Sequence, residues 1–128
     1  MSSFLTERRE TLAHALAGAT LSAVGAVESV KTLPAIVLEP SPQWLDAQLS
    51  PSGPGRQVVC QLRGRLLVKA AESEGALDAL EEEFEGILER LPKHWRFDRA
   101  EPPAPLKAGE IDALGVEFFV SFNYSLTP

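Results

Sequence analysis

The sequence has few of the side chains that most often carry out protein chemistry. Its 128 residues include one cysteine and two histidines. One cysteine cannot form an internal disulfide, and Cys60 lies in an alternating apolar pattern that favours a buried, inert thiol and a reducing compartment. His14 and His94 have no neighbouring ligands at the spacing of a metal site. We therefore predict no metal and no cofactor.

Long apolar runs and positive charge are also scarce. No segment approaches the roughly 20 apolar residues that span a bilayer, and Ala13–Gly25 is less apolar than the core of a signal peptide. We expect a soluble protein without a targeting segment. The net charge of −6 argues against binding to free nucleic acid, because phosphate contacts require a basic surface. No Gly-rich phosphate loop or Ser/His/Asp set is present, so we predict a protein that is not an enzyme.

The first part of the chain predicts a helix followed by short strands. The length fits a single domain over residues 1–128. Ser2 or Ser3 can cap a helix whose apolar residues recur at helical spacing: Leu5, Leu12, Leu16 and Ala19. Leu21–Val30 is ambiguous and is assigned a short strand. Leu33–Glu39 is a clearer strand bounded by prolines, which cannot donate to a ladder.

The middle of the chain has the clearest periodicities. Gln57–Lys69 alternates apolar and polar residues, so one face of this strand belongs to the core. Gly64 interrupts the apolar face and predicts either a bulge or a close approach of a helix. A helix from about Ser73 to Leu91 follows, with a stripe at steps of three and four residues: Leu77, Leu80, Phe84, Ile87, Leu88 and Leu91.

The remaining segments complete an α+β domain. His94–Asp98 predicts a short strand, and Val116–Leu126 predicts a long one with Phe119 on its polar side. Two stretches rich in proline, at about 40–56 and 101–109, predict long loops. We expect a mostly antiparallel sheet of four to five strands, with two helices packed on one face and the order α-β-β-β-α-β-β.

Charge is distributed unevenly between the central strand and the second helix. The strand carries Arg56, Arg63, Arg65 and Lys69, whereas the helix is acidic and includes Glu81, Glu82 and Glu85. Two interpretations remain open. These residues form ordinary solvated faces, or they form surfaces of opposite sign that meet on neighbouring copies of the protein.

Several apolar residues occur where polar ones are expected. Trp44 and Leu45 fall in the first predicted loop, and Val59, Leu67 and Phe119 fall on the polar side of the sheet. Exposed aromatic residues are frequent anchors of binding interfaces. Alternatively, Trp44 folds back and covers the edge of the core.

The order of these segments and their residue patterns resemble those of the tail terminator proteins of long-tailed bacteriophages. The resemblance covers nearly the whole chain: the Ala-rich first helix, the Pro34–Pro40 strand, Pro42-Gln-Trp-Leu45, the Arg56–Lys69 strand, Ala76-Leu-Asp-Ala-Leu80, Leu91-Pro-x-x-Trp95, and the last Val/Phe strand. The segment before Pro34 is short and has no marked turn, which departs from the pattern and leaves its first strand in doubt.

The resemblance implies a virion protein that is assembled in the host cytoplasm. Such proteins form a homo-oligomeric ring, usually hexameric, at the head-proximal end of the tail tube. The ring ends polymerisation of the tail tube protein and joins the tail to the head–tail connector or stopper protein, and DNA can pass through it. The alternatives are another neck protein, such as a head–tail stopper or tail-completion protein, and a small ligand-binding α+β module. An enzyme that uses the carboxylates of the acidic helix is a further alternative.

Overall fold

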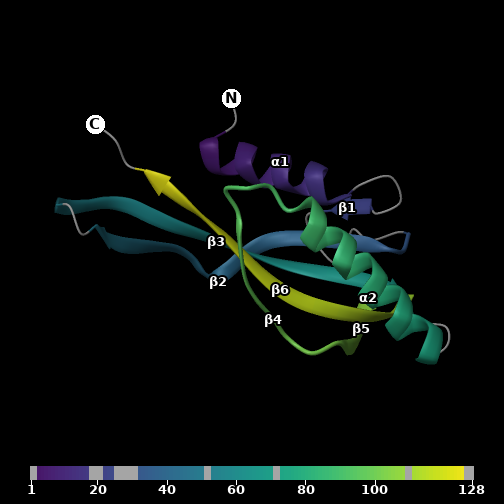
Figure 1. Ribbon diagram of the computed structural model, residues 1–128. Coiled ribbons are helices and arrows are strands. Elements are labelled where there is room, and N and C mark those ends of the chain that lie inside the picture. The colour runs from purple at the N-terminus through teal and green to yellow at the C-terminus, as the bar shows by residue number, and fades with distance from the viewer. Residues whose placement is uncertain are drawn as a thin grey trace.

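Two helices and six strands make up the described part of the molecule. The computed structural model describes residues 3–17, 22–24, 32–50, 53–70, 73–108 and 111–125. The elements follow one another as α1 (Phe4–Ala17), β1 (Ser22–Val24), β2 (Ala35–Ser50), β3 (Gly53–Lys69), α2 (Ser73–Arg90), β4 (Arg96–Ala100), β5 (Ala104–Ala108) and β6 (Ile111–Ser125) (Figure 1). This arrangement confirms the predicted α+β class and order of elements, and it adds β5.

The strands form one sheet in the order β1-β2-β3-β6-β4, and β5 also pairs with β6. Only the pairing of β1 with β2 is parallel among the described strands. The central β3–β6 pair is continuous from Gln57↔Ser125 to Lys69↔Ala113. The sheet is therefore mostly antiparallel, as predicted, and β3 lies at its centre.

Both helices pack on the same face of this sheet. Ser3 accepts a hydrogen bond through its Oγ from the backbone N–H of Thr6 at 3.0 Å, which confirms the predicted N-cap. The shared core cluster combines residues of both helices with the alternating residues of β2, β3 and β6: Leu12, Leu16, Ile36, Leu38, Cys60, Leu62, Leu66, Val68, Leu80, Ile87, Trp95, Val116, Phe118, Val120 and Phe122. The alternation predicted an inward face on β3 and β6, and the cluster confirms it for Cys60, Leu62, Leu66 and Val68 and for Val116, Phe118, Val120 and Phe122. Val58, predicted on the same face of β3, is only partly buried and lies outside the cluster. The predicted helix position Ala19 lies outside the described residues.

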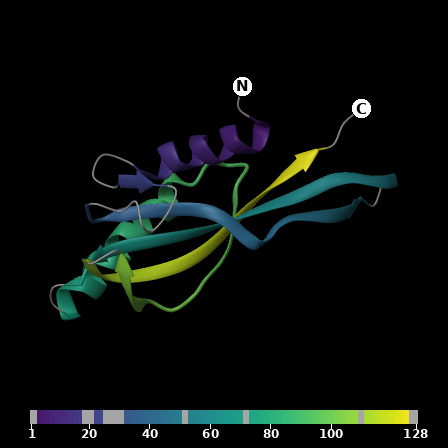
Figure 2. The same cartoon turned by 180° about the vertical axis from the view of Figure 1, so that it is seen from behind.

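The first predicted loop, at about 40–56, is wrong. Strand β2 continues to Ser50 and β3 already begins at Gly53, so the two strands form a long hairpin. The pairing absorbs the prolines because the register shifts between Pro40 and Leu45. Proline is tolerated at such irregularities and on a strand without an outer neighbour. The hairpin extends beyond the helical layer, as Figures 1 and 2 show from opposite sides.

The second predicted loop, at about 101–109, is also partly wrong. Ala104–Ala108 forms β5, which pairs with the beginning of β6. Strand β6 itself begins at Ile111 and not near Val116. The added strand covers a second, smaller cluster on the face opposite the helices, formed by Ala35, Val37, Leu67 and Ala113 with Leu33 and Leu106. Leu67 is therefore buried and not exposed.

Two further expectations about packing need correction. Gly64 is in register with both neighbouring strands, so it marks no bulge. The close approach there comes from the ring of Phe118, not from a helix: a Cβ on Gly64 would lie 2.3 Å from Phe118 Cζ. On α2, Leu77 and Leu88 are each 41% exposed, because the helix packs through a narrower stripe that includes Ala76, Leu80, Phe84 and Ile87.

Candidate functional site

The outer half of the hairpin joins the end of β6 to form a three-stranded arm. Leu45 pairs with Cys60, which also pairs with Phe122, and Gln48 pairs with Gln57, which also pairs with Ser125. We use the name arm for these three segments, 45–50, 53–60 and 122–125. The arm extends past the N-terminal end of α1, so its outer part lacks a helical layer in the described residues (Figures 1 and 2). Strands need an apolar face or a helix packed against them to be stable on their own. A partner surface would therefore stabilise the outer part of the arm.

Exposed apolar side chains gather at the root of the arm. Trp44 is 40% exposed, Leu45 is 43% exposed and Phe4 of α1 is 42% exposed. The ring centroid of Phe4 lies 6.3 Å from that of Phe122 and 4.8 Å from that of Tyr124. Trp44 and Leu45 therefore lie in a strand, not in the predicted loop, and both keep a surface that a partner could cover.

A hollow of about 270 Å³ lies beside this apolar root, between the start of α1 and strands β2, β3 and β6. Its lining includes Arg9, Trp44 and Cys60. Burial raises the pKa of the Cys60 thiol, and a hydrogen bond from the Trp44 side chain partly opposes this effect. The thiol is 2% exposed, as the sequence predicted, and a raised pKa makes it a poor nucleophile.

The face opposite the helices carries a network of ion pairs. Arg63 donates through Nε and Nη2 to Glu39 Oε1, at 3.1 and 2.8 Å. Arg65 lies 3.6 Å from the same carboxylate oxygen and places its Nε 3.5 Å from Glu117 Oε2. Their side chains are 24–34% exposed, so solvent screens the network only in part. Both arginines are thus paired within their own chain and are not free cations.

Hydrogen bonds extend the polar surface toward β4. Asp98 accepts hydrogen bonds from Gln61 Nε2 and from Ser121 Oγ, each at 3.1 Å. Ser121 Oγ accepts a hydrogen bond from Arg96 Nη2 at 3.0 Å, and Gln61 Oε1 accepts one from Ser41 Oγ at 2.8 Å. These bonds fix the edge strand β4 to the centre of the sheet.

Phe119 is covered and not exposed. It is 5% exposed, and the guanidinium of Arg99 lies 4.2 Å from its ring centroid. Arg99 also pairs with Glu101. Strand β4 places Arg99 opposite Phe119 in the ladder, so the Arg99 guanidinium covers the Phe119 ring in a cation–π contact. Phe119 is therefore not available as an exposed anchor for a partner.

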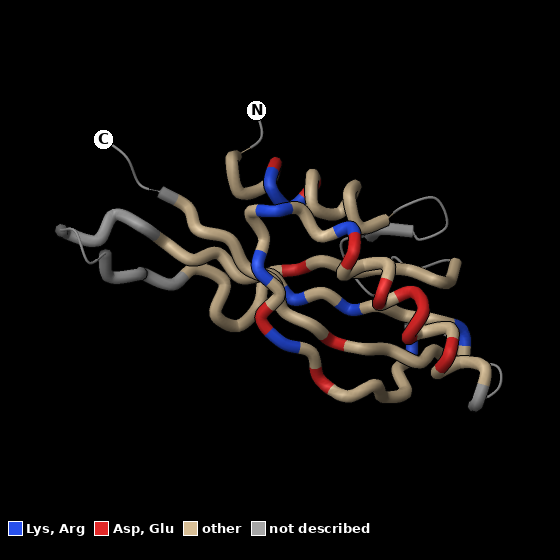
Figure 3. The backbone as a smooth tube through the Cα atoms, in the orientation of Figure 1, with Lys and Arg blue, Asp and Glu red and all other residues tan. Residues whose placement is uncertain are grey.

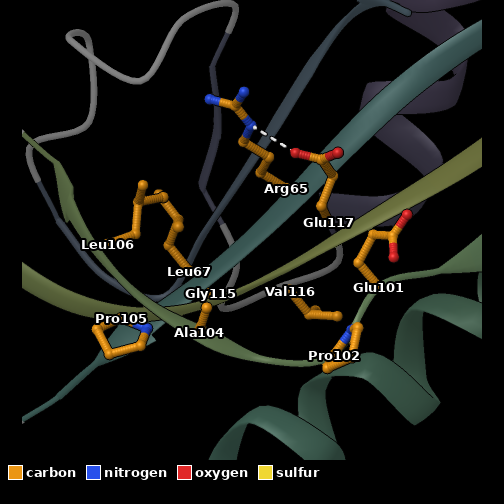
Figure 4. A pocket seen from close by; sticks show the side chains of 10 residues that line it. All are labelled: Arg65, Leu67, Glu101, Pro102, Ala104, Pro105, Leu106, Gly115, Val116 and Glu117. Carbon is orange, nitrogen blue, oxygen red and sulfur yellow. Dashed lines mark ion pairs between the residues drawn. The ribbon is translucent and has the colours of Figure 1, made fainter.

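A shallow hollow of about 290 Å³ lies between this ion-pair network and β5 (Figure 4). One side is charged, with Arg65, Glu101 and Glu117, and the other is apolar and includes Leu67 and Leu106. Its volume is at the lower limit of small-molecule pockets, which usually measure about 300–1,000 Å³. The hollow can hold a small polar group but does not enclose one.

The acidic residues of α2 form an exposed ridge (Figure 3). Asp78, Glu81, Glu82, Glu85 and Glu89 are all exposed on this helix. Among the described residues, no ion pair involves the predicted Glu81, Glu82 or Glu85. A contact between this ridge and Arg63 or Arg65 of a neighbouring copy would have to break existing ion pairs.

The remaining predicted basic residues are separate from that network. Lys69 is exposed at the end of β3 and has no ion pair with another described residue. The backbone of Arg56 lies in the arm, but its side chain is outside the described part of the structure. The structure therefore does not bring the ten predicted site residues into one site. It places two of them at the arm root, three on the paired sheet face and three on the helix ridge, and leaves Arg56 and Lys69 apart from all three groups.

Sequence reasoning missed the partners that organise the sheet face: Glu39, Asp98, Arg99 and Glu117. Glu39 is in register with Arg63, and Glu117 with Arg65. An alignment of the strands would have placed these opposite charges together. The pairing of Glu39 with Arg63 was not predicted, because the segment after Glu39 was assigned to a loop and its register with β3 was unknown.

No protein-family model and no curated protein matches the chain.

No helix among the described residues is long and apolar enough to cross a membrane. Within the same residues, no group of three or more His, Cys, Asp or Glu side chains could hold a metal ion.

Proposed function

We propose that the chain is the subunit of a ring at the head-proximal end of a phage tail tube. The observation that carries the proposal is the arm, which projects from a compact core and presents strand edges and apolar root residues. In a ring every copy uses two different surfaces, one for each neighbour. An asymmetric projection of this kind supplies such a pair of surfaces.

The charge distribution supports an assembly role in the neck of the virion. The acidic ridge of α2 lies on the helix-covered side of the sheet, whereas the ion-paired residues alternate along the strands with core residues and so lie on the other side. A terminator contacts a tail tube protein on one side and a head–tail connector or stopper protein on the other. Chemically different faces allow two such partners to be distinguished by charge.

Mass photometry of the purified chain, with negative-stain images of the same sample, tests the oligomer. We expect a closed ring, because identical heterologous contacts close when the rotation between copies divides a full turn. The resemblance to tail terminator proteins implies about six copies. Addition of the ring to polymerising tail tube protein should shorten the tubes and leave the rings at one end. A chain that stays monomeric and leaves tube length unchanged contradicts the proposal.

A small ligand-binding module is the second candidate, favoured by the hollow beside Arg65 and Glu117. The open, shallow form of this hollow makes it the weaker candidate. A panel of small polar molecules should leave the melting temperature unchanged if the ring proposal is correct. A stabilisation that disappears in Arg65→Ala, but not in the exposed control Glu85→Ala, would instead favour ligand binding.

A further inference from the structure

The arm has two open strand edges, one on each side of β3. On one side, β1 pairs only with Ala35–Val37, so no described strand lies outside the later part of β2. On the other side, β4 pairs with β6 only up to Ser121, so no described strand lies outside Phe122–Ser125. Open edges present unpaired N–H and C=O groups and readily accept another strand.

The two open edges lie at the same level of the arm. Leu45 and Phe122 both pair with Cys60, and Gln48 and Ser125 both pair with Gln57. Leu45–Gln48 and Phe122–Ser125 are therefore segments of equal length on opposite sides of the same four residues of β3. A copy placed beside the arm could add its own β2 segment directly next to this part of β6.

Both edges are blocked at the same point nearer the core. Pro40 pairs with Leu62, and the register shift between Pro40 and Leu45 interrupts the β2 edge there. Ser121 pairs with Gln61 and, on its other side, with Arg96 of β4. Proline, irregular pairing and a covering strand all prevent edge pairing. Among the described residues, both β2 and β6 therefore lack an outer strand along the arm.

We propose that the open β2 edge of one copy pairs with the open β6 edge of the next, so that the arms join into one sheet that runs around the ring. The joint is heterologous, because each copy contributes β2 to one neighbour and β6 to the other. Both β2 and β6 are antiparallel to β3 and so are parallel to each other. When ring-related copies keep their strands along the ring axis, the joint is therefore parallel. This inference rests on the proposed ring.

Cysteine crosslinking tests the joint, because the two faces of a strand alternate. Asp46 pairs with Val59, which pairs with Asn123, so these positions share one face of the arm. Ala47 is the next position and belongs to the opposite face. Within one copy, positions 46 and 123 are separated by two strand spacings, about 10 Å, which is too far for a disulfide.

The test uses D46C combined with N123C or with S125C, in a C60A background. Mild oxidation should give a ladder of crosslinked oligomers that ends at the size of the ring, in at least one of the two pairs. The matched pair A47C with N123C places the thiols on opposite faces and should give no ladder. Under reducing conditions all variants should keep the wild-type ring by mass photometry, which shows that they fold and assemble.

Each contrary result has a distinct meaning. If the reduced rings form but neither D46C pair crosslinks, the strand joint is wrong and the ring proposal stands. A dimer from D46C alone, with no ladder from the pairs, would show β2-to-β2 pairing and overturn the head-to-tail joint. If the wild-type chain is monomeric even beside tail tube protein, both proposals fail together.

Discussion

Single residues decide how closely the layers of this protein approach one another. Gly64 leaves room for the ring of Phe118, which lies across the central strand at the heart of the core. Cys60 sits at the junction of the core and the arm with its thiol almost completely buried. The role of Gly64 is steric, and the burial of Cys60 changes the pKa of its thiol. Both effects can be measured.

Replacement of Gly64 by alanine should destabilise the fold by about 1–3 kcal/mol, the usual cost of overpacking a core. The new Cβ would lie 2.3–2.6 Å from three atoms of the Phe118 ring, which is itself fully buried. Equilibrium unfolding in urea measures the change. Gly75→Ala is the matched control, because nothing lies within 4 Å of its Cβ position. An equal loss of stability in both variants would contradict the close packing at Gly64.

The Cys60 thiol should resist alkylation at pH 8 until the protein unfolds. Burial raises its pKa above the ordinary value of 9.0 and also blocks access of the reagent. We expect labelling by iodoacetamide to be more than about tenfold slower in the native protein than in guanidinium. Mass spectrometry follows the reaction.

The same raised pKa predicts how Cys60 affects stability at alkaline pH. The thiol ionises first in the unfolded chain, so the stability linked to its protonated form is complete below the unfolded pKa. This contribution should fall as the pH rises through about 9 toward the folded pKa. The difference in unfolding free energy between wild type and C60A should therefore decrease over this range. A constant difference would contradict the assigned shift.

Whole elements are held together by a few contacts between their ends. Arg90, in the last turn of α2, donates through Nε and Nη2 to the carbonyl oxygen of Leu16, at 3.2 and 2.9 Å. This bond satisfies a carbonyl in the last turn of α1 and places a positive charge at the negative end of its dipole. The two helices are thereby joined at their C-terminal ends.

Arg90→Ala should destabilise the protein by about 1–3 kcal/mol, the range for a hydrogen bond to a charged group. The Leu16 carbonyl would lose its side-chain partner, and the helix pair would lose its shared contact. Thermal unfolding monitored by circular dichroism measures the effect. Glu89→Ala, one residue earlier and exposed, should change the melting temperature much less. Similar losses in the two variants would contradict the role of Arg90.

The whole molecule consists of a packed core and an arm whose outer part lies beyond the core cluster. Along β3, the core cluster of described side chains extends no further toward the hairpin end than Cys60. Two helices cover one face of the core, whereas β5 and the ion pairs close parts of the other face. Folding and assembly should therefore be separable.

Replacement of residues 46–57 by a short turn should abolish the ring and leave the monomer folded. The replaced part lies beyond the core cluster, so the melting temperature should stay within a few degrees of the wild-type monomer. Size-exclusion chromatography with light scattering measures the oligomer. A shortened variant that still forms the ring would contradict an assembly role for the arm. Loss of the fold would instead show that the arm is part of the stable unit.

Much of this architecture could be predicted from local pattern. The alternation in β3 and β6 and the helical spacing in α2 identify the buried faces, because a residue's burial follows the period of its own element. Such patterns were correct for Cys60, Leu66, Phe118 and Ile87. They failed for Leu77 and Leu88, since the width of the stripe that a helix buries depends on the surface beneath it.

The tertiary structure alone decided how the strands pair and what the sheet face presents. The prolines at 40 and 42 indicate a loop, but a strand without an outer neighbour and a shifted register accommodate them. From the sequence Phe119 is expected to be an exposed aromatic residue, but β4 places Arg99 over its ring. Arg63 is expected to be a free cation, but β2 places Glu39 beside it. Local preference acts within an element, whereas register and pairing join residues far apart in the chain. The sequence by itself therefore determined the class of fold and the helix-covered face, and only the tertiary structure revealed the arm.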